Sequence, residues 1–331
     1  MFRSTDIESL RASLAGIDFL APSVVTPLAQ RYFDFYGLNF SCWGDQDRAS
    51  IQHHFGSFDA AGYTIACHYF VCADEAPAGT LFVLHGYYDH AGLYAHLIAF
   101  GLRHKLAVVI FDLPGHGLSS GEQASIPSFS LYRDVFAECL RLAQQAGVAR
   151  PWHVMGQSTG GAIAMDYCLS GHASGNYCSR QQSSHQFEKV VLLAPLVRPH
   201  RWWQGRLMHA VLEPFVDSIA RGFVRNSSDE EFLRFIQEQD PLQSRKLSAR
   251  WVRALKNWQK EFLDYPPCFA RIHVIQGALD TTVDWRYNLR IIEDKFPNAA
   301  MNMIADARHH LANESEAIRA KIFRILEPIF D

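Results

Sequence analysis

Short apolar runs alternate along this chain with longer stretches in which apolar residues recur every three or four positions. That alternation is typical of strands followed by helices, in a mostly parallel sheet whose two faces are both covered. The pattern therefore predicts an α/β fold with a mostly parallel central sheet flanked by helices. We expect strands over residues 64–72, 81–84, 107–111, 152–155, 189–194, 272–275 and 301–304, and helices near residues 92–104, 129–146 and 313–329.

The interval between Leu196 and Ile272 breaks this alternation. Its roughly seventy residues have a helical rather than a strand pattern, and they are too many for an ordinary connection between a helix and a strand. We expect residues 198–268, called the cap segment from here on, to form a helical cap, or lid. Residues 1–197 and 269–331 would then form the core.

Within the cap segment, four apolar residues recur at the spacing of one helix face: Trp251, Leu255, Trp258 and Phe262. Such a stripe either packs the cap on the core or lines an apolar pocket for an acyl chain. Under the second interpretation, Trp251 and Trp258 are candidate substrate contacts. Ser228 and Glu231 have the spacing of a capping box, which predicts the start of another helix there.

Composition and charge narrow the classes of protein. The chain has 331 residues, 48% hydrophobic and 13% aromatic, as expected of a folded globular protein. Its formal net charge of -3 is the wrong sign for a nucleic-acid-binding chain, so we expect no nucleic-acid partner. Residues 198–260, however, hold 12 Lys and Arg against 7 Asp and Glu. These cations either form a solvated helix face, rest on an anionic lipid surface or hold a phosphate headgroup.

The cysteines and the beginning of the chain bear on location. Seven cysteines, without a C-x-x-C pair, argue against a disulfide framework and against a zinc site. Residues 1–8 are acidic where a signal peptide is basic and then apolar, and no apolar run reaches membrane-spanning length. We expect a cytoplasmic protein, with transient contact of the cap at the inner membrane face as an extension of that prediction. The pattern leaves the oligomeric state open.

The strongest chemical signal is the run Gly156-Gln157-Ser158-Thr159-Gly160, which stands between an apolar strand and a helical stretch. This is the pattern of a nucleophile elbow, a sharp strand-turn-helix that presents a serine hydroxyl at a helix N-terminus. The glycines two positions before and two positions after the serine allow the strained turn. Ser158 is therefore the candidate nucleophile.

A serine needs a base to take its proton and an acid to orient that base. The turn after the strand at 272–275 offers Asp280 and Asp284 as the acid, and we prefer Asp280 because it comes first out of the strand. The loop after the last strand offers the adjacent His309 and His310 as the base. Position alone hardly separates these two histidines.

An acyl-transfer site also needs two N–H donors for the oxyanion. The backbone amide of Thr159, directly after the nucleophile, and that of Tyr87, in the turn after the strand at 81–84, are the candidates. The glycine-rich run 113–121 has neither dinucleotide-binding nor P-loop spacing, and the paired histidines lack zincin spacing. We therefore expect no cofactor and no metal.

Several motifs together resemble the α/β-hydrolase fold and, within it, the monoacylglycerol lipase and bacterial lysophospholipase group. They are His85-Gly86-Tyr87-Tyr88-Asp89-His90-Ala91-Gly92-Leu93-Tyr94, Asp112-Leu113-Pro114-Gly115-His116-Gly117-Leu118-Ser119, Asp240-Pro241-Leu242, and Ala307-Arg308-His309 ahead of Asn313-Glu314. The resemblance implies Ser158, Asp280 and His309 as the triad. Asp89 replaces the group's usual Glu, Leu93 replaces its Arg, and residues 176–186 look like an extra surface loop.

The resemblance implies a serine hydrolase that cleaves carboxylic esters of single-chain lipids, a lysophospholipid or a monoacylglycerol, through an acyl-enzyme. A prolyl-type aminopeptidase or a small-ester carboxylesterase of the same fold is the alternative. The basic cap argues against the aminopeptidase, which needs acidic groups to hold an ammonium. A catalytically silent binding protein of this fold is the non-enzymatic hypothesis.

Overall fold

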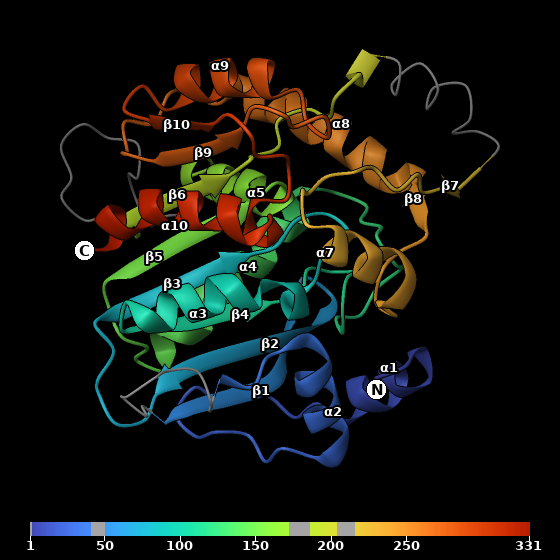
Figure 1. Cartoon of the computed structure of the whole chain (residues 1–331), viewed down its shortest axis with the longest axis vertical. Helices are drawn as coiled ribbons and strands as arrows, with labels where there is room; N and C mark the ends of the chain where they lie inside the picture. The colour runs from blue at the N-terminus through green and yellow to red at the C-terminus, as the bar shows by residue number, and fades with distance from the viewer. Residues whose placement is uncertain (1, 41–49, 172–185, 204–215) are drawn as a thin grey trace.

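The computed structural model describes residues 2–40, 50–171, 186–203 and 216–331. At its centre lies an eight-stranded sheet with the order β1-β2-β4-β3-β5-β6-β9-β10 (Figure 1). From β4 to β10 neighbouring strands run parallel, while β2 is antiparallel to both β1 and β4. The predicted mostly parallel sheet is confirmed. The strands are β1 (Ile51–Ala60), β2 (Tyr63–Cys72), β3 (Gly79–Leu84), β4 (Leu106–Phe111), β5 (Trp152–Gln157), β6 (Lys189–Leu193), β9 (His273–Gly277) and β10 (Ala300–Ile304).

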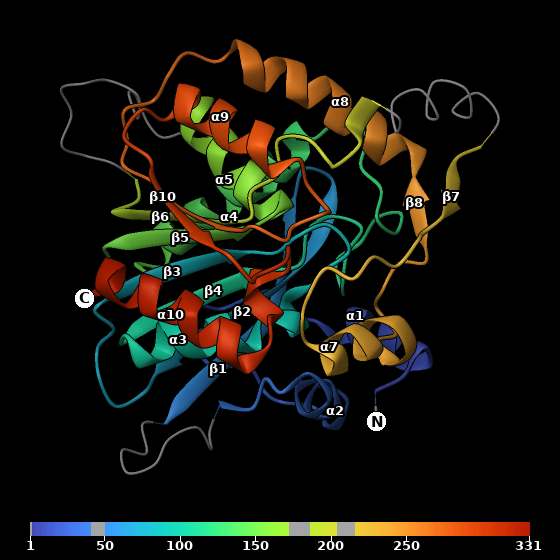
Figure 2. The ribbon, with the colours of Figure 1, turned by 45° about the horizontal axis from the view of Figure 1, so that its top comes forward.

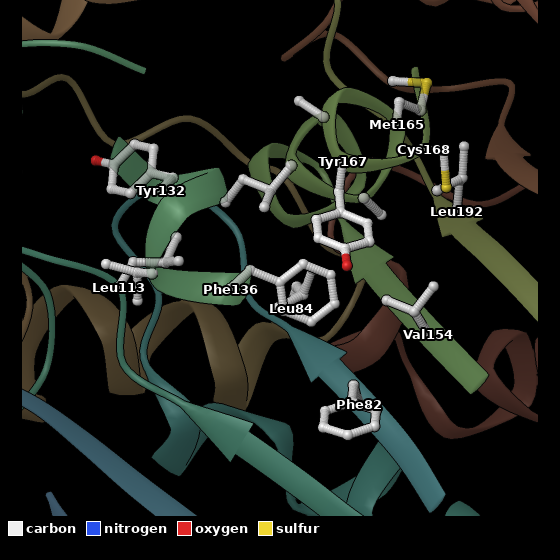
Figure 3. Packing of buried hydrophobic residues seen from close by; sticks show 14 of the residues in the cluster. Phe82, Leu84, Leu113, Tyr132, Phe136, Val154, Met165, Tyr167, Cys168 and Leu192 are labelled. Atoms are coloured by element: carbon white, nitrogen blue, oxygen red, sulfur yellow. The ribbon is translucent and has the colours of Figure 1, made fainter. Parts of the chain in front are cut away.

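Helices cover both faces of the sheet (Figure 2). Side chains alternate along a strand, so Leu81 and Val83 of β3 join one buried cluster and Phe82 and Leu84 join the other. Figure 3 shows part of the second cluster, in which Phe82 lies below Phe136 of α4. The first face carries α1 (Ser4–Ser13), α2 (Pro27–Tyr36), α3 (Ala95–Arg103) and α10 (Glu316–Phe330), and the second carries α4 (Ser130–Gln145), α5 (Thr159–Leu169) and α9 (Trp285–Lys295).

Strand β1 lies in a region where the apolar pattern predicted no element. It pairs with β2 as an antiparallel hairpin, from Ala60 opposite Tyr63 to Ile51 opposite Cys72. The three consecutive polar residues of β1 after Ile51 hide the strand alternation. In the structure His53 packs against the Phe33 ring of α2, with ring centroids 4.3 Å apart. Contact with α2 therefore covers part of a polar strand, and the hydrophobic pattern of the sequence did not predict that strand.

The cap segment is not purely helical as predicted. Its described part holds two short antiparallel strands, β7 (Ser218–Ala220) and β8 (Lys246–Ser248), beside α7 (Glu230–Arg234) and α8 (Ala249–Asp264). Strands of three residues are too short to show a period of two, which is why the pattern missed them. Residues 204–215 of the cap segment, and residues 172–185 with most of the expected extra loop, lie outside the described residues.

The expected capping box at Ser228 is wrong by one residue. The carboxylate of Asp229 accepts from the amides of Glu231 and Phe232 and so caps α7. The Ser228 amide instead donates over 2.7 Å to the side chain of Glu314, just before the N-terminus of the core helix α10. The N-cap of α7 is therefore Asp229 rather than Ser228.

Helix α8 carries the predicted apolar stripe, and all four of its residues are buried. Trp258 stacks on Phe129, which precedes α4, with ring centroids 4.6 Å apart. Trp251 stacks on Tyr87 at 3.7 Å. Burying such a side chain contributes about 2–3 kcal/mol, so α8 holds the cap segment on the core. Among the described helices, none has the length and apolar character that crossing a membrane requires.

Candidate active site

The serine sits in a strained turn between β5 and α5. Ser158 has φ 52° and ψ -110°, a conformation that L-residues rarely adopt. A Cβ on Gly156 would clash with the Gly160 carbonyl, and a Cβ on Gly160 would clash with the backbone of Leu84. The two glycines let the first turn of α5 approach the neighbouring strands closely. The sequence-predicted elbow is thus present, with its serine buried at the helix start.

Three side chains converge at this point from distant parts of the chain. The Nε2 atom of His309 lies 2.9 Å from the Ser158 hydroxyl oxygen, and its Nδ1 atom lies 2.7 Å from an Asp280 carboxylate oxygen. The other Asp280 oxygen accepts from the backbone amides of Thr282, at 2.7 Å, and Val283, at 3.1 Å. The carboxylate is therefore fixed on both oxygens.

The electrostatics of Asp280 match this geometry. Burial alone would raise the pKa of its carboxyl, but His309, the Gln276 side chain and the Val283 amide outweigh burial and lower the pKa below its usual value. Asp280 is therefore a carboxylate at neutral pH. A buried anion there favours the imidazolium that His309 becomes when it accepts a proton.

The neighbouring candidates take other positions. Asp284 caps α9 by accepting from the Tyr287 amide, and it pairs with Arg198 at 2.7 Å. His310 faces Asp89 instead, with its Nε2 atom 3.2 Å from a carboxylate oxygen of that residue. The structure thus brings Asp280 and His309 to Ser158, and it brings neither Asp284 nor His310 there.

The two residues expected to supply oxyanion donors line the same cavity. Tyr87 and Thr159 both line it, together with Ser158. Neither backbone amide donates to any residue that the structure describes, so both N–H groups are available to a ligand oxygen. The phenol of Tyr87 is engaged elsewhere, since it donates to the Ala124 carbonyl over 2.7 Å.

A polar cluster holds the turn that carries Tyr87. The Gly86 amide donates to the Tyr94 hydroxyl, which in turn donates to Asp89 over 2.8 Å. Burial alone would raise the pKa of Asp89, but His310 and Tyr94 outweigh it and hold the pKa well below its usual range. Asp89 therefore serves as an anionic anchor in the place where the resembling group has Glu. Leu93, in the place of that group's Arg, is buried.

The loop that carries His309 is anchored to the cap segment. The carbonyl of Asn226 accepts from the amides of both His309, at 3.0 Å, and His310, at 2.7 Å. The buried Glu314 bridges the Arg308 amide, at 2.6 Å, and the Ser228 amide, at 2.7 Å. Sequence reasoning missed these contacts because a backbone carbonyl carries no sequence signal.

A second anchor joins cap and core inside the protein. Asp240 of the cap segment is buried, lies 3.0 Å from His90 of the core and accepts from the Tyr36 hydroxyl at 2.7 Å. Burial alone would lower the pKa of His90, but Asp240 outweighs burial and raises it. The pair is therefore an ion pair at mildly acidic pH. Asp240 and His90 both belong to motifs that carried the resemblance.

A cavity of about 320 Å³ opens over the serine. Trp251 lines it as the sequence predicted, whereas Trp258 does not, because its ring is packed against Phe129 instead. The candidate substrate contact at Trp258 is thus corrected to a packing residue. The cavity's apolar lining includes Leu196, Trp202, Ile219, Leu247, Trp251 and Val252. Its polar lining includes Tyr88, Asp89, Arg221, Asn226 and His310.

No group of three or more His, Cys, Asp or Glu side chains suited to a metal occurs in the described part of the chain. The histidines that the sequence placed in pairs have other contacts. His53 lies 2.8 Å from His68 in the β1–β2 hairpin, and His309 and His310 face different carboxylates.

Comparison with known proteins identifies relatives. The model of the family described as serine aminopeptidase, S33, matches residues 75–316. Human monoglyceride lipase is 31% identical over 39% of this chain and 40% of its own length. The monoacylglycerol lipase of Mycolicibacterium smegmatis is 32% identical over 38% of this chain and 41% of its own length. Phospholipase YtpA of Bacillus subtilis is 23% identical over 63% of this chain and 79% of its own length.

The first relatives are matched over only part of their length. The match covers 25% of an abhydrolase domain-containing protein of Dictyostelium discoideum, and 40% of each mammalian monoglyceride lipase. Solved structures show the fold more completely. A soluble variant of monoglyceride lipase from Saccharomyces cerevisiae superposes with a TM-score of 0.70 at 16% identity, over 88% of this chain and 97% of that one.

Proposed function

The chain belongs to the serine aminopeptidase S33 family of α/β hydrolases, and from that premise we propose that it is a serine hydrolase cleaving carboxylic esters of single-chain lipids. The observation that carries this proposal is the relay of 2.9 Å from Ser158 to His309 and 2.7 Å from His309 to Asp280. Relays of this kind activate a serine hydroxyl for attack on a carbonyl. Monoglyceride lipases and a phospholipase among the relatives support a lipid ester as substrate.

In the first step His309 takes the Ser158 proton while the serine oxygen bonds to the ester carbonyl carbon. The carbonyl oxygen becomes an oxyanion, held by the amides of Tyr87 and Thr159. When the tetrahedral intermediate collapses, the ester C–O bond breaks and His309 gives its proton to the leaving alcohol. The acyl group is now bound to the Ser158 oxygen as an ester, which is the acyl-enzyme.

In the second step His309 takes a proton from a water molecule, whose oxygen attacks the acyl carbonyl. Collapse breaks the bond to Ser158, and the proton returns to the serine oxygen. The net reaction consumes one ester and one water and releases a fatty acid and an alcohol. Asp280 stays ionised throughout and stabilises the charged imidazole in both steps.

The cavity supports a substrate with a single acyl chain. Its apolar lining includes residues from α8, from the β7–β8 pair and from residues 196–202. Pockets of this kind bind an extended hydrocarbon because transfer of its apolar surface out of water is favourable. We propose that the cap segment acts as a lid that screens this chain from solvent.

Transient contact with a membrane surface would bring such a substrate to the cavity. Val216 and Val224 line the cavity yet are exposed, and the exposed Arg201 also lines it. Exposed apolar and cationic groups in one cavity lining suit an anionic lipid surface. Sedimentation with anionic but not with neutral vesicles is the expected result, and no sedimentation with either would contradict this contact.

Aminopeptidase activity is a second candidate because the family's description names it. Such an enzyme needs carboxylates to hold a free ammonium group. Among the described lining residues of the cavity, Asp89 is the only carboxylate, and His310, Tyr94 and the Gly86 amide already engage it. The arrangement therefore favours ester hydrolysis over cleavage at a free N-terminus.

The test is labelling by a fluorophosphonate probe followed by a substrate panel. The full-length protein is expected to be labelled, Ser158→Ala to lose both labelling and turnover, and Ser128→Ala, at an exposed serine, to behave like the wild type. The panel sets monoacylglycerols and lysophospholipids beside short p-nitrophenyl esters and prolyl amides. No labelling would mean a binding protein, and turnover of prolyl amides alone would replace the lipid substrate.

A further inference from the structure

The cavity contains one cation whose position the proposed chemistry does not explain. Arg221 follows strand β7, lines the cavity together with Ser158 and is only partly exposed. Its guanidinium carbon lies 3.8 Å from the centre of the Tyr88 ring and 4.5 Å from that of Phe223. Stacking on two aromatic rings holds the planar group in one orientation.

The charge of Arg221 is not neutralised by an acid. Its Nη1 atom donates to the Gln243 side chain at 2.7 Å and to the Ser244 carbonyl at 3.2 Å. In the described part of the chain, no carboxylate forms an ion pair with it, and Nε and Nη2 donate to no residue there. A guanidinium has five N–H donors, so three remain for a ligand.

Burial makes this arrangement costly unless a ligand completes it. Burial lowers the pKa of Arg221 below its usual value, although Tyr88 and Asp89 act in the opposite direction and raise it. Asp89 is the carboxylate that influences this charge, but its oxygens lie against His310, Tyr94 and Gly86. A partly buried cation with unused donors is typical of a site for an anion.

The neighbouring backbone is strained in a way that presents this cation. Tyr88 has φ 74°, in the left-handed region that a bulky L-residue avoids, at a cost of about 1–3 kcal/mol. The preceding Tyr87 stacks on Trp251, while Tyr88 carries its ring under Arg221. The rings of Tyr87 and Tyr88 have centroids 4.0 Å apart. Trp251, Tyr87, Tyr88 and Arg221 therefore form one continuous stack in the cavity lining.

The lining of the cavity combines apolar side chains with this cation. Leu196, Leu247 and Trp251 are among its apolar residues, and the Leu196 amide donates to the Ser158 carbonyl. The acyl chain of a single-chain lipid ester is apolar and carries no charge. A charged group that meets Arg221 must therefore belong to the alcohol portion of the ester.

We propose that Arg221 is a specificity-determining residue that binds an anionic group, a phosphate or a carboxylate, on the alcohol portion of the substrate. The inference rests on the proposed function, because it assigns the headgroup of the same ester. The planar fork of the guanidinium matches both anions, and an anion there uses the free donors. A neutral glycerol headgroup leaves the charge of Arg221 uncompensated.

The experiment compares three esters of one medium-length acyl chain, used below their micelle concentrations: 1-acylglycerol, 1-acylglycerol 3-phosphate and the acyl ester of glycolate. The second carries a phosphate and the third a carboxylate. The wild type is expected to have a higher kcat/KM for at least one anionic ester than for the neutral one. Which of the two anionic esters has the higher kcat/KM shows whether the site prefers a phosphate or a carboxylate.

Arg221→Met keeps much of the side chain's length and removes the charge. It is expected to lower kcat/KM for the preferred anionic ester at least tenfold, mainly through KM, and to change the neutral ester less than about threefold. Arg221→Lys should fall between the two, because it keeps the charge but loses the fork and the stacking. Arg225→Met, at an exposed arginine paired with Glu230, is the matched control and should resemble the wild type.

Two results would overturn the inference. Equal losses on neutral and anionic esters would show that Arg221 only holds the β7–β8 region in place. An unchanged preference in Arg221→Met would show that it does not touch the headgroup. Failure of the proposed function looks different, because the wild type would then hydrolyse none of the three esters. In that case slowing of fluorophosphonate labelling by the anionic ester in the wild type, but not in Arg221→Met, still reports on anion binding.

Discussion

The two sides of the cavity over Ser158 are built differently. On the core side, the reacting groups follow strand ends and are held largely by backbone amides and carbonyls, as Asp280 is by the amides of Thr282 and Val283. On the cap side, Trp251 and Arg221 are held largely by side-chain contacts with Tyr87, Tyr88 and Gln243. A contact made by backbone atoms is kept when the side chain of that residue is replaced, whereas a contact made by the side chain itself is lost.

This difference separates chemistry from recognition. The proton relay needs geometry accurate to a fraction of an ångström, and a rigid parallel sheet supplies it. Selection of the headgroup and of the acyl chain needs only complementary surfaces. The cap segment can change such a surface without disturbing the sheet. We therefore expect changes on the core side to alter kcat, and changes on the cap side to alter KM and stability. Five predictions test that division.

The largest effect is expected for Asp280→Asn. The amide cannot stabilise the charged imidazole, so kcat for an ester should fall by about 10⁴-fold with little change in KM or folding. Steady-state kinetics and circular dichroism measure both. Asp284→Asn is the control, since Asp284 caps α9 and pairs with Arg198, and it should cost about 1 kcal/mol of stability but little activity. A larger rate loss in Asp284→Asn would reverse the assignment.

The anchor between cap and core should give the next largest effect. Asp240→Asn leaves His90 buried without its counter-charge, so the free energy of unfolding should fall by about 3–5 kcal/mol, and KM should rise as the cap segment loosens. Urea denaturation measures the first quantity. Tyr36→Phe, which removes one hydrogen bond to the same carboxylate, should cost only about 1 kcal/mol. Equal losses in both variants would argue against an ion pair.

The same anchor predicts a pH dependence. The pKa of His90 is raised in the folded protein, so its contribution is complete below the unfolded value of about 6.5 and is lost as pH rises through the folded value. The stability difference between the wild type and His90→Gln should therefore shrink toward alkaline pH. A difference that stays constant across that range would contradict the pairing.

Two tryptophans on one helix give a matched test of smaller size. Trp251→Leu should raise KM for long-chain esters about tenfold and spare short ones, because Trp251 lines the cavity. Trp258→Leu should lower stability by about 2 kcal/mol without altering chain-length preference, since its ring packs on Phe129. Chain-length profiles of both variants decide the matter. If Trp258→Leu shifted the profile and Trp251→Leu did not, the roles would be exchanged.

Tyr87→Phe should have the smallest effect. The oxyanion donor proposed there is the backbone amide, which the substitution keeps, so kcat should stay within about twofold. Stability should fall by about 1 kcal/mol, because the hydroxyl loses its bond to the Ala124 carbonyl. A hundredfold loss of kcat would instead place the phenol in the chemistry.

Much of this architecture was predictable from local pattern. Buried parallel strands are continuous apolar runs, so β3, β4 and β5 were found within two residues of their observed ends. The edge strand β1 and the short pair β7 and β8 were missed, because polar residues and short length hide their period. Asp229 rather than Ser228 caps α7, although both residue types are good helix caps.

The amino-acid order determined the elbow at Ser158, the strand-end position of an acid and the final-loop position of a histidine, because these depend on strand, turn and helix patterns close in sequence. It did not separate His309 from His310 by position, nor identify Arg221, because each choice depends on which way a side chain faces after distant segments pack. Only the tertiary structure decided that His309 lies next to Ser158 and that Trp258 packs on Phe129 outside the cavity lining. It also decided that Arg221 stacks on Tyr88 in that lining.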